Sequence, residues 1–157
     1  MSKPRPRILA IDDTPTNLLT LGVALEADFD LQIATSGAMG LAMATQTPPD
    51  LILLDVMMPE MDGYETCRRI MASPTLRTTP VIFITALAGI ETESTGLTLG
   101  AADYITKPFN VEITRQRICN LLEREQLRKE VEQHRDHLDE LVQARTLALS
   151  VAKEAAE

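Results

Sequence analysis

The stretch DLILLDVMMPEMDG, residues 50–63, combines a buried-strand pattern with a polar turn, and it decides the fold. Its first half is an almost unbroken apolar run that ends in Asp55. Such a run is typical of a central strand in a parallel sheet that helices cover on both faces. Pro59 and Gly63 in the second half mark a loop. The stretch therefore predicts a parallel sheet with a carboxylate at its carboxyl edge.

Four other strand-like segments flank this run and alternate with amphipathic stretches, which is typical of βα units. The run at 80–85 is similarly apolar, whereas the run at 30–34 reads only weakly as a strand. We therefore predict an α/β fold, with the strands RILAI (7–11), DLQIA (30–34), DLILLD (50–55), PVIFIT (80–85) and ADYIT (102–106).

Helix start and stop signals lie between the strands. Thr14 is a candidate N-cap, because Pro15 after it is favoured at the first helical position. Gly100 is a candidate C-terminal cap, since glycine readily adopts the left-handed conformation that ends many helices. The four predicted helices cover about 15–27, 37–45, 62–73 and 89–99.

From about Asn110 to Glu157 the chain has no proline or glycine, which predicts one long helix. We divide the chain into a compact domain over 1–122 and a helical extension over 123–157. A three-four spacing predicts a two-stranded coiled coil, and Val142 and Leu149 fit a competing frame that indicates a stutter. The predicted seam contains Val131, His134, Leu138, Leu141, Arg145, Ala148, Ala152 and Ala155.

This helical extension has too little apolar surface to be stable alone in water, so it should pair with a partner helix or pack on the domain. We expect a homodimer through this helix, and an isolated solvated helix is the alternative. The helical pattern still runs at Glu157 without a stop signal, so we expect a linker to an output domain further along the chain. His134 and His137 lie in a charged helical stretch, and we assign them no phosphotransfer role.

Composition bounds the function. The chain has 157 residues, 45% of them hydrophobic and 24% charged, which suits one globular domain with an appendage. A net charge of -8 would repel nucleic acid and anionic membranes, so we expect neither as a direct partner. No signal peptide or membrane span is evident, and we expect a cytoplasmic protein. Cys67 and Cys119 lack metal-ligand spacing, so we expect buried or half-buried thiols at both positions.

Polar residues end the strands in a pattern that core packing does not explain. Asp12 and Asp13 end the first strand, Asp55 the third and Thr85 the fourth, while Lys107 follows the fifth. Singly, each could be a turn residue, a cap, a strand residue or a surface charge. Together they fall at the carboxyl edge of one parallel sheet, where open α/β sheets bind ligands. We therefore interpret them as one site.

Three neighbouring carboxylates would repel one another, so the site implies a divalent cation. Oxygen ligands with room for water and a phosphate oxygen suit Mg²⁺. An aspartate carboxylate can attack phosphorus and form an acyl phosphate. In this interpretation Lys107 supplies positive charge to the phosphate oxygens, and Thr85 supplies a hydrogen bond.

Four motifs together resemble the receiver domain of two-component response regulators: IDD at 11–13, LLDVMMPEMDG at 53–63, ITA at 84–86 and YITKPF at 104–109. The resemblance covers about the first 120 residues. It implies a flavodoxin-like, doubly wound sheet of strand order 2-1-3-4-5. It also implies a phosphoryl donor, which is a sensor histidine kinase or a phosphotransfer protein.

The resemblance also implies roles for single residues. Asp55 would be the phosphoacceptor; Asp13, Asp55 and the backbone carbonyl of Met57 would bind Mg²⁺, and Asp12 would help through water. Lys107 would bind the phosphate, and the Lys107–Pro108 peptide bond would be cis. Thr85 and Tyr104 would form the switch, although a strand aromatic such as Tyr104 is also a common core residue.

Three alternatives compete with this interpretation. A phosphatase of the haloacid dehalogenase type needs an Asp-x-Asp pair, but Thr14 stands two positions after Asp12. A flavodoxin-like nucleotide binder would suffer repulsion between phosphate and the two aspartates after the first strand. An unphosphorylated scaffold receiver, acting through protein-protein contacts, remains open. We do not expect an enzyme beyond self-phosphorylation and autodephosphorylation.

Overall fold

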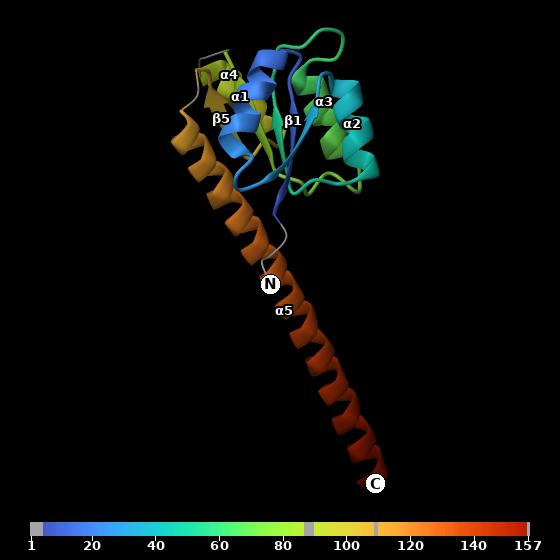
Figure 1. The fold of residues 1–157 in the computed structure, drawn as a ribbon. Helices are drawn as coiled ribbons and strands as arrows, with labels where there is room; N and C mark the ends of the chain where they lie inside the picture. The colour runs from blue at the N-terminus through green and yellow to red at the C-terminus, as the bar shows by residue number, and fades with distance from the viewer. Residues whose placement is uncertain (1–4, 87–89, 109, 157) are drawn as a thin grey trace. The chain divides into compact units, whose positions relative to one another are not determined.

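The computed structural model describes residues 5–86, 90–108 and 110–156, and Figure 1 shows the order of its elements. Within these described residues, five strands alternate with five helices. In order these are β1 (Arg7–Ile11), α1 (Pro15–Leu25), β2 (Asp30–Ala34), α2 (Gly37–Gln46), β3 (Leu51–Leu54), α3 (Gly63–Ala72), β4 (Val81–Thr85), α4 (Ile90–Thr98), β5 (Asp103–Thr106) and α5 (Val111–Ala156).

The strands form one parallel sheet of order β2-β1-β3-β4-β5, so the predicted α/β flavodoxin-like fold is confirmed. The register pairs Ile11 of β1 with Leu54 of β3, and Leu54 with Phe83 of β4. The residues that follow these strands are therefore brought to the same edge of the sheet. That edge carries the site described below.

Alternation along each strand supplies two separate cores, one on each face of the sheet. Leu9, Ile52 and Phe83 face α2 and α3, where they pack with Cys67 and Ile70. The intervening strand residues face α1 and the first turns of α5. That second core contains Ile8, Leu53, Ile82 and Ile105 from the strands with Leu18, Leu25, Ile118 and Leu121 from the helices. Central strands covered on both faces explain the unbroken apolar runs in the sequence.

Element boundaries differ from the prediction by one or two residues in most places. Helix α1 ends at Leu25, and the next turn is closed by hydrogen bonds from the backbone N–H groups of Asp28 and Phe29 to the Leu25 carbonyl. Thr14 is the N-cap residue, but its side chain makes no capping hydrogen bond. Gly100 has a φ of 106°, as its predicted capping role requires. The predicted fourth helix starts at Gly89, which lies outside the described residues.

The long helix α5 belongs to two compact units, Met1–Leu122 and Glu123–Glu157. Its first turns contribute Ile118 and Leu121 to the core of the first unit. In the second unit, apolar side chains such as Val131 and Leu141 are exposed by 58% and 53%. None of the helices, within the part of the chain that the structure describes, is both long and apolar enough to cross a membrane.

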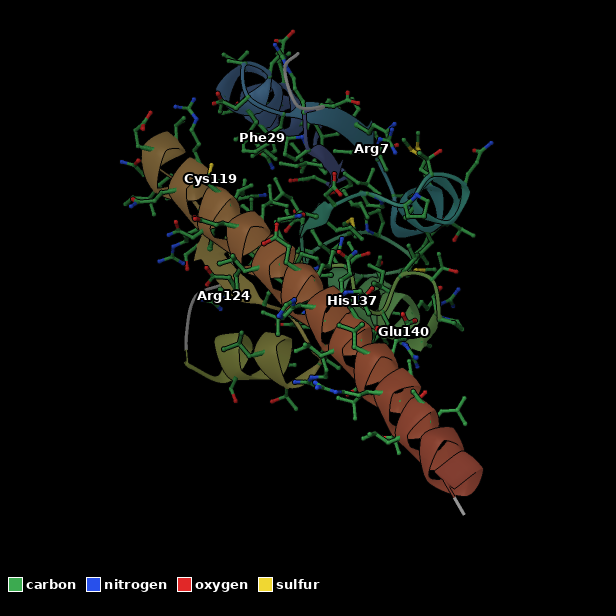
Figure 2. The ribbon with its side chains drawn as sticks, turned by 90° about the horizontal axis from the view of Figure 1, so that it is seen from below. Arg7, Phe29, Cys119, Arg124, His137 and Glu140 are labelled. Atoms are coloured by element: carbon green, nitrogen blue, oxygen red, sulfur yellow. The ribbon has the colours of Figure 1, made fainter. Side chains whose placement is uncertain are left out.

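The two cysteines differ in environment, and this gives a labelling prediction. Cys67 is fully buried on α3, and burial raises the pKa of its thiol to about 11. The expected burial is wrong for Cys119, which is exposed on α5 because it lies on the side of the helix away from Ile118 (Figure 2). Since the thiolate is the reactive form, a brief iodoacetamide treatment of the native protein near pH 8 should add one adduct by intact mass. Urea should allow a second, and Cys119→Ser should remove the native adduct. Two native adducts would contradict the buried position of Cys67.

Candidate functional site

The site lies at the carboxyl edge of the sheet, where backbone hydrogen bonds between neighbouring strands place each residue. The Asp12 N–H donates to the Ala34 carbonyl at 3.1 Å, and the Asp55 N–H to the Ile11 carbonyl at 3.0 Å. At the other side, the Lys107 N–H donates to the Thr85 carbonyl at 2.8 Å. The ladder of the parallel sheet therefore extends into the site residues.

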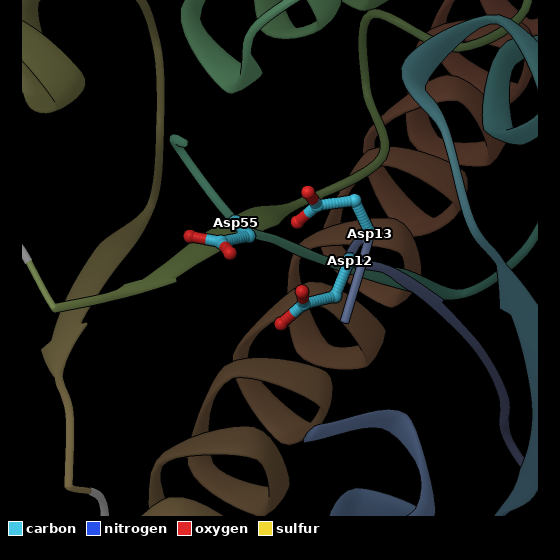
Figure 3. Close-up of side chains that lie close together, drawn as sticks. All are labelled: Asp12, Asp13 and Asp55. Carbon is cyan, nitrogen blue, oxygen red and sulfur yellow. The ribbon is translucent and has the colours of Figure 1, made fainter. Parts of the chain in front are cut away.

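Three carboxylates lie together at this edge. One oxygen from each of Asp12, Asp13 and Asp55 lies within 4.8 Å of the others, and Figure 3 shows the three side chains. Asp12 and Asp55 are buried, at 4% and 6% exposure, whereas Asp13 is more open. This is a set of hard oxygen donors with one side toward solvent, which suits a hard divalent cation such as Mg²⁺.

Lys107 contacts two of the three carboxylates. Its Nζ lies 3.1 Å from Asp12 Oδ2 and 3.3 Å from Asp55 Oδ2, and its side chain is only 17% exposed. The Lys107–Pro108 peptide bond is cis. An ammonium shared between two buried carboxylates reduces their mutual repulsion. Lysine therefore acts as a counter-charge inside the site.

Asp12 is held by three donors. Besides Lys107, its Oδ1 accepts a hydrogen bond from the Thr14 N–H at 2.9 Å, and its Oδ2 accepts one from the Asn17 Nδ2 at 3.1 Å. Thr14 and Asn17 both lie at the start of α1. The first turn of that helix therefore fixes the orientation of the Asp12 carboxylate.

The charged form of the Asp55 carboxyl is destabilised by its surroundings. Burial raises the pKa of its carboxyl above the ordinary value of 3.8, and the nearby charge of Asp12 raises this pKa further. Lys107 and a hydrogen bond from the Met57 N–H, at 3.4 Å from Asp55 Oδ1, act in the opposite direction. A cation or a reacting electrophile near the Asp55 carboxylate would stabilise its charged form.

The loop after Asp55 packs closely against its backbone. Asp62 caps α3 by accepting a hydrogen bond from the Glu65 N–H at 2.8 Å, and the Gly63 N–H donates to the Val56 carbonyl at 2.8 Å. A Cβ on Gly63 would collide with the Asp55 carbonyl oxygen and lie 2.7 Å from Val56 Cα. Only glycine therefore lets the loop return so close to the strand end.

The predicted switch residues Thr85 and Tyr104 lie on the neighbouring strands β4 and β5. Thr85, at the end of β4, is fully buried. Tyr104 is 4% exposed, and its ring centroid lies 6.3 Å from that of Phe83. On the backbone side, Arg117 of α5 donates to the Tyr104 carbonyl at 3.1 Å and to Asp103 at 3.3 Å. Tyr104 thus connects the strand core with α5.

Comparison with known proteins agrees with this geometry. The family model described as the response regulator receiver domain matches residues 8–119. The chain belongs to this receiver family.

Receivers from differently named proteins are similar to this one. The DNA-binding dual master transcriptional regulator RpaA of Synechocystis is 43% identical over 120 residues, which are 76% of this chain and 50% of that protein. Response regulator PleD of Caulobacter vibrioides is 46% identical over 105 residues, 66% of this chain and 23% of that protein. This chain thus matches half or less of the length of these relatives.

A solved structure shows the same receiver architecture. The receiver domain of a signal transduction histidine kinase from Syntrophus aciditrophicus is 37% identical and has a TM-score of 0.69. The match covers 75% of this chain and 90% of that one. The receiver fold therefore accounts for most of the chain, apart from the distal part of α5.

Two contributors to the receiver site were not predicted from the sequence. Asn17 orients Asp12, and Arg117 contacts the Tyr104 carbonyl. A polar amide in the first turn of a helix that follows a site aspartate could have pointed to Asn17. Arg117 gave no such signal, because it is one of several basic residues on a long charged helix.

The raised pKa of Asp55 predicts how the stability of the metal-free receiver depends on pH. Between 3.8 and the raised value, the folded state binds more protons than the unfolded state. In EDTA, this group should therefore lower the free energy of unfolding as pH rises through that window. Asp55→Asn should remove this contribution. The urea midpoint of the variant should therefore rise relative to that of the wild-type protein as pH increases through the window. Parallel pH profiles would contradict the assignment.

Proposed function

We propose that this receiver accepts a phosphoryl group on Asp55 from a partner histidine kinase or phosphotransfer protein, and signals through a change in conformation. The observation that carries the proposal is the position of the Asp55 carboxylate beside Lys107 and two further aspartates at the open edge of the sheet. A nucleophile, a counter-charge and a cation site there meet the requirements of phosphoryl transfer to a carboxylate.

Asp12, Asp13, Asp55 and the backbone carbonyl of Met57 are the groups that we propose for Mg²⁺ binding, with Asp12 acting through water. The donor set contains only oxygen atoms and includes carboxylates, which suits Mg²⁺. When bound, the ion would neutralise charge on the transferring phosphoryl group. The chain itself supplies the nucleophile and the lysine.

In the transfer step, an oxygen of the Asp55 carboxylate attacks phosphorus while the bond from phosphorus to the donor's histidine nitrogen breaks. The electron pair of that bond stays on the imidazole, which takes up a proton. The product is an acyl phosphate on Asp55. Attack by water on the acyl phosphate later releases inorganic phosphate. We propose no catalysis beyond these two reactions, self-phosphorylation and autodephosphorylation. The chain would therefore act as a signalling domain.

The conformational signal would pass through Thr85 and Tyr104. Phosphate on Asp55 would draw the Thr85 hydroxyl toward it as a hydrogen-bond donor. Tyr104 lies on the strand beside Thr85, and its carbonyl accepts a hydrogen bond from Arg117 of α5. A shift at Thr85 would therefore reach the surface formed by α4, β5 and the first turns of α5.

We further propose the domain assignment 1–122 for the receiver and 123–157 for a coiled-coil linker, which forms a homodimer and leads to an output domain. The acidic net charge of -8 disfavours direct binding of this chain to nucleic acid or to anionic membranes. We also propose that the protein is cytoplasmic, where the kinase domain of its phosphoryl donor would lie.

Incubation with Mg²⁺ and acetyl phosphate tests the proposal. One added phosphoryl mass per chain is expected by intact mass spectrometry, and EDTA should prevent it. The added mass should map to the peptide that contains Asp55. No Mg²⁺-dependent phosphoryl mass would reject the proposal and favour the scaffold receiver instead.

A further inference from the structure

Several large apolar side chains of the second unit are exposed. Its helix exposes 55% of Leu127, 58% of Val131, 47% of Leu138 and 53% of Leu141. These residues are spaced by four, seven and three positions, so they lie along one side of the helix. A stripe of this width is the seam that a second helix covers in a coiled coil.

The stripe defines a heptad frame, with Val131 and Leu138 at position a and Leu127 and Leu141 at position d. In this frame the residues that flank the seam carry opposite charges on its two sides. Position e holds Arg128 and Arg135, and position g holds Glu123 and Glu130. The charges are sorted by side of the seam, which intrahelical pairing alone would not require.

This sorting distinguishes the two possible orientations of a partner helix. In a parallel, in-register pair, each g residue faces the e residue five positions later on the other chain. Glu123 would then face Arg128, and Glu130 would face Arg135, twice each by symmetry. In an antiparallel pair, e residues face e residues and g residues face g residues. Each arginine would then lie opposite another arginine or an apolar e residue. Each glutamate would lie opposite another glutamate, His137 or Ala144, so no pair of opposite charges would form between the carboxylates and the arginines.

We propose that the second unit pairs with the same helix of a second copy of this chain, parallel and in register, through the seam Leu127–Leu141. This inference deepens the homodimer of the proposed function and rests on it. The surface is complementary to itself only in that orientation, which identifies a second copy as the occupant. Both receiver units are then attached at the N-terminal end of the paired helix.

Polar residues within the seam limit how tightly this pair holds. His134 occupies a d position and Arg145 an a position, and Val142 and Leu149 follow a shifted frame. Polar residues at seam positions fix register at a cost in stability. The strongest contacts are therefore confined to Leu127–Leu141, and the more distal part of the helix can change frame at low cost.

Disulfide trapping tests orientation and register together. In a Cys119→Ser background, Leu141→Cys places the new thiol at a d position, where it faces its own copy only in a parallel, in-register pair. Mild oxidation should convert most of this protein into a dimer that a reductant separates. Gln143→Cys lies on the outer face and is the matched control, with little dimer expected. Equal trapping at both positions, or at neither, would overturn the proposal.

Charge reversal gives a second test, which does not alter the apolar seam. Within the helix, Arg128 already pairs with Glu125 and Glu132, so the Glu130–Arg135 pair is the cleaner target. Glu130→Arg should raise the dimer dissociation constant about fivefold by sedimentation equilibrium at low salt. Adding Arg135→Glu should restore it to within about twofold. The outer-face reversal Asp136→Arg should change it less than about twofold.

Failure of Arg135→Glu to rescue Glu130→Arg would contradict the parallel pairing. The same proteins are also tested for phosphorylation with Mg²⁺ and acetyl phosphate. Normal phosphorylation without trapping or rescue would reject the parallel helix pair and leave the proposed function intact. Trapping and rescue without phosphorylation would support the parallel helix pair and reject the proposed phosphorylation.

Discussion

Asp55→Asn is expected to abolish phosphorylation of the receiver by acetyl phosphate. Asparagine has nearly the same shape and can still accept a hydrogen bond from Lys107, so the fold should survive the change. It lacks the anionic oxygen that attacks phosphorus, so no acyl phosphate can form. Intact mass spectrometry should show the full phosphoryl mass on the wild-type chain and none on the variant. Circular dichroism should show the same secondary structure for both.

Asp30→Asn is the matched control for this experiment. Asp30 lies at the start of β2 with its side chain 60% exposed, and its ion pair with Arg7 spans 4.0 Å. Phosphorylation of this variant should equal that of the wild-type chain. Retained phosphorylation of Asp55→Asn would place the phosphoacceptor elsewhere and reject the assigned role of Asp55.

Gly63→Ala is expected to damage both stability and phosphorylation. Its methyl group would meet the carbonyl oxygen of Asp55, and backbone atoms cannot move aside as a flexible side chain can. We expect a loss of about 3 kcal/mol in the free energy of unfolding, at the upper end of overpacking effects. The displaced strand end would also move Asp55 away from Lys107, so the rate of phosphorylation should fall. Urea unfolding and a phosphorylation time course measure the two effects.

Gly22→Ala controls for the general effect of replacing glycine. Gly22 lies inside α1, and the nearest atom to an added Cβ is Leu31 Cδ2 at 3.9 Å. Alanine is the better helix former, so this change should stabilise the receiver by up to about 1 kcal/mol. Equal effects of the two substitutions would show that close packing at Gly63 is not the cause.

Most of the sheet and the central site could be predicted because strong local signals agree with the tertiary structure. The apolar runs at β3 and β4 are covered on both faces, and the polar residues at their ends have no place in a core. Asp12, Asp13 and Asp55 could be placed together because parallel strands end at one edge. The weak run at β2 is explained by its position at the edge of the sheet, where burial is only partial.

Other features depend on contacts that the local sequence does not encode. Thr14 is of a residue type that often caps helices, but its side chain makes no capping hydrogen bond to α1. Its backbone N–H instead donates a hydrogen bond to the Asp12 carboxylate. The contact between Arg117 and the Tyr104 carbonyl joins residues 13 positions apart on different elements. The end of α1 at Leu25 depends on how Phe29 enters the core. Each follows from three-dimensional packing.

The position of Lys107 has a consequence for the electrical balance of the site. Three carboxylates and one ammonium leave a formal charge that one divalent cation would neutralise. Conversion of the Asp55 carboxylate into an acyl phosphate adds negative charge to that balanced group. The surplus arises where two of the three aspartates are almost inaccessible to water, so solvent screens it poorly. Phosphorylation of the cation-bound site would therefore turn a nearly neutral group of side chains into an anionic one, and the surrounding donors would have to reorganise around that charge.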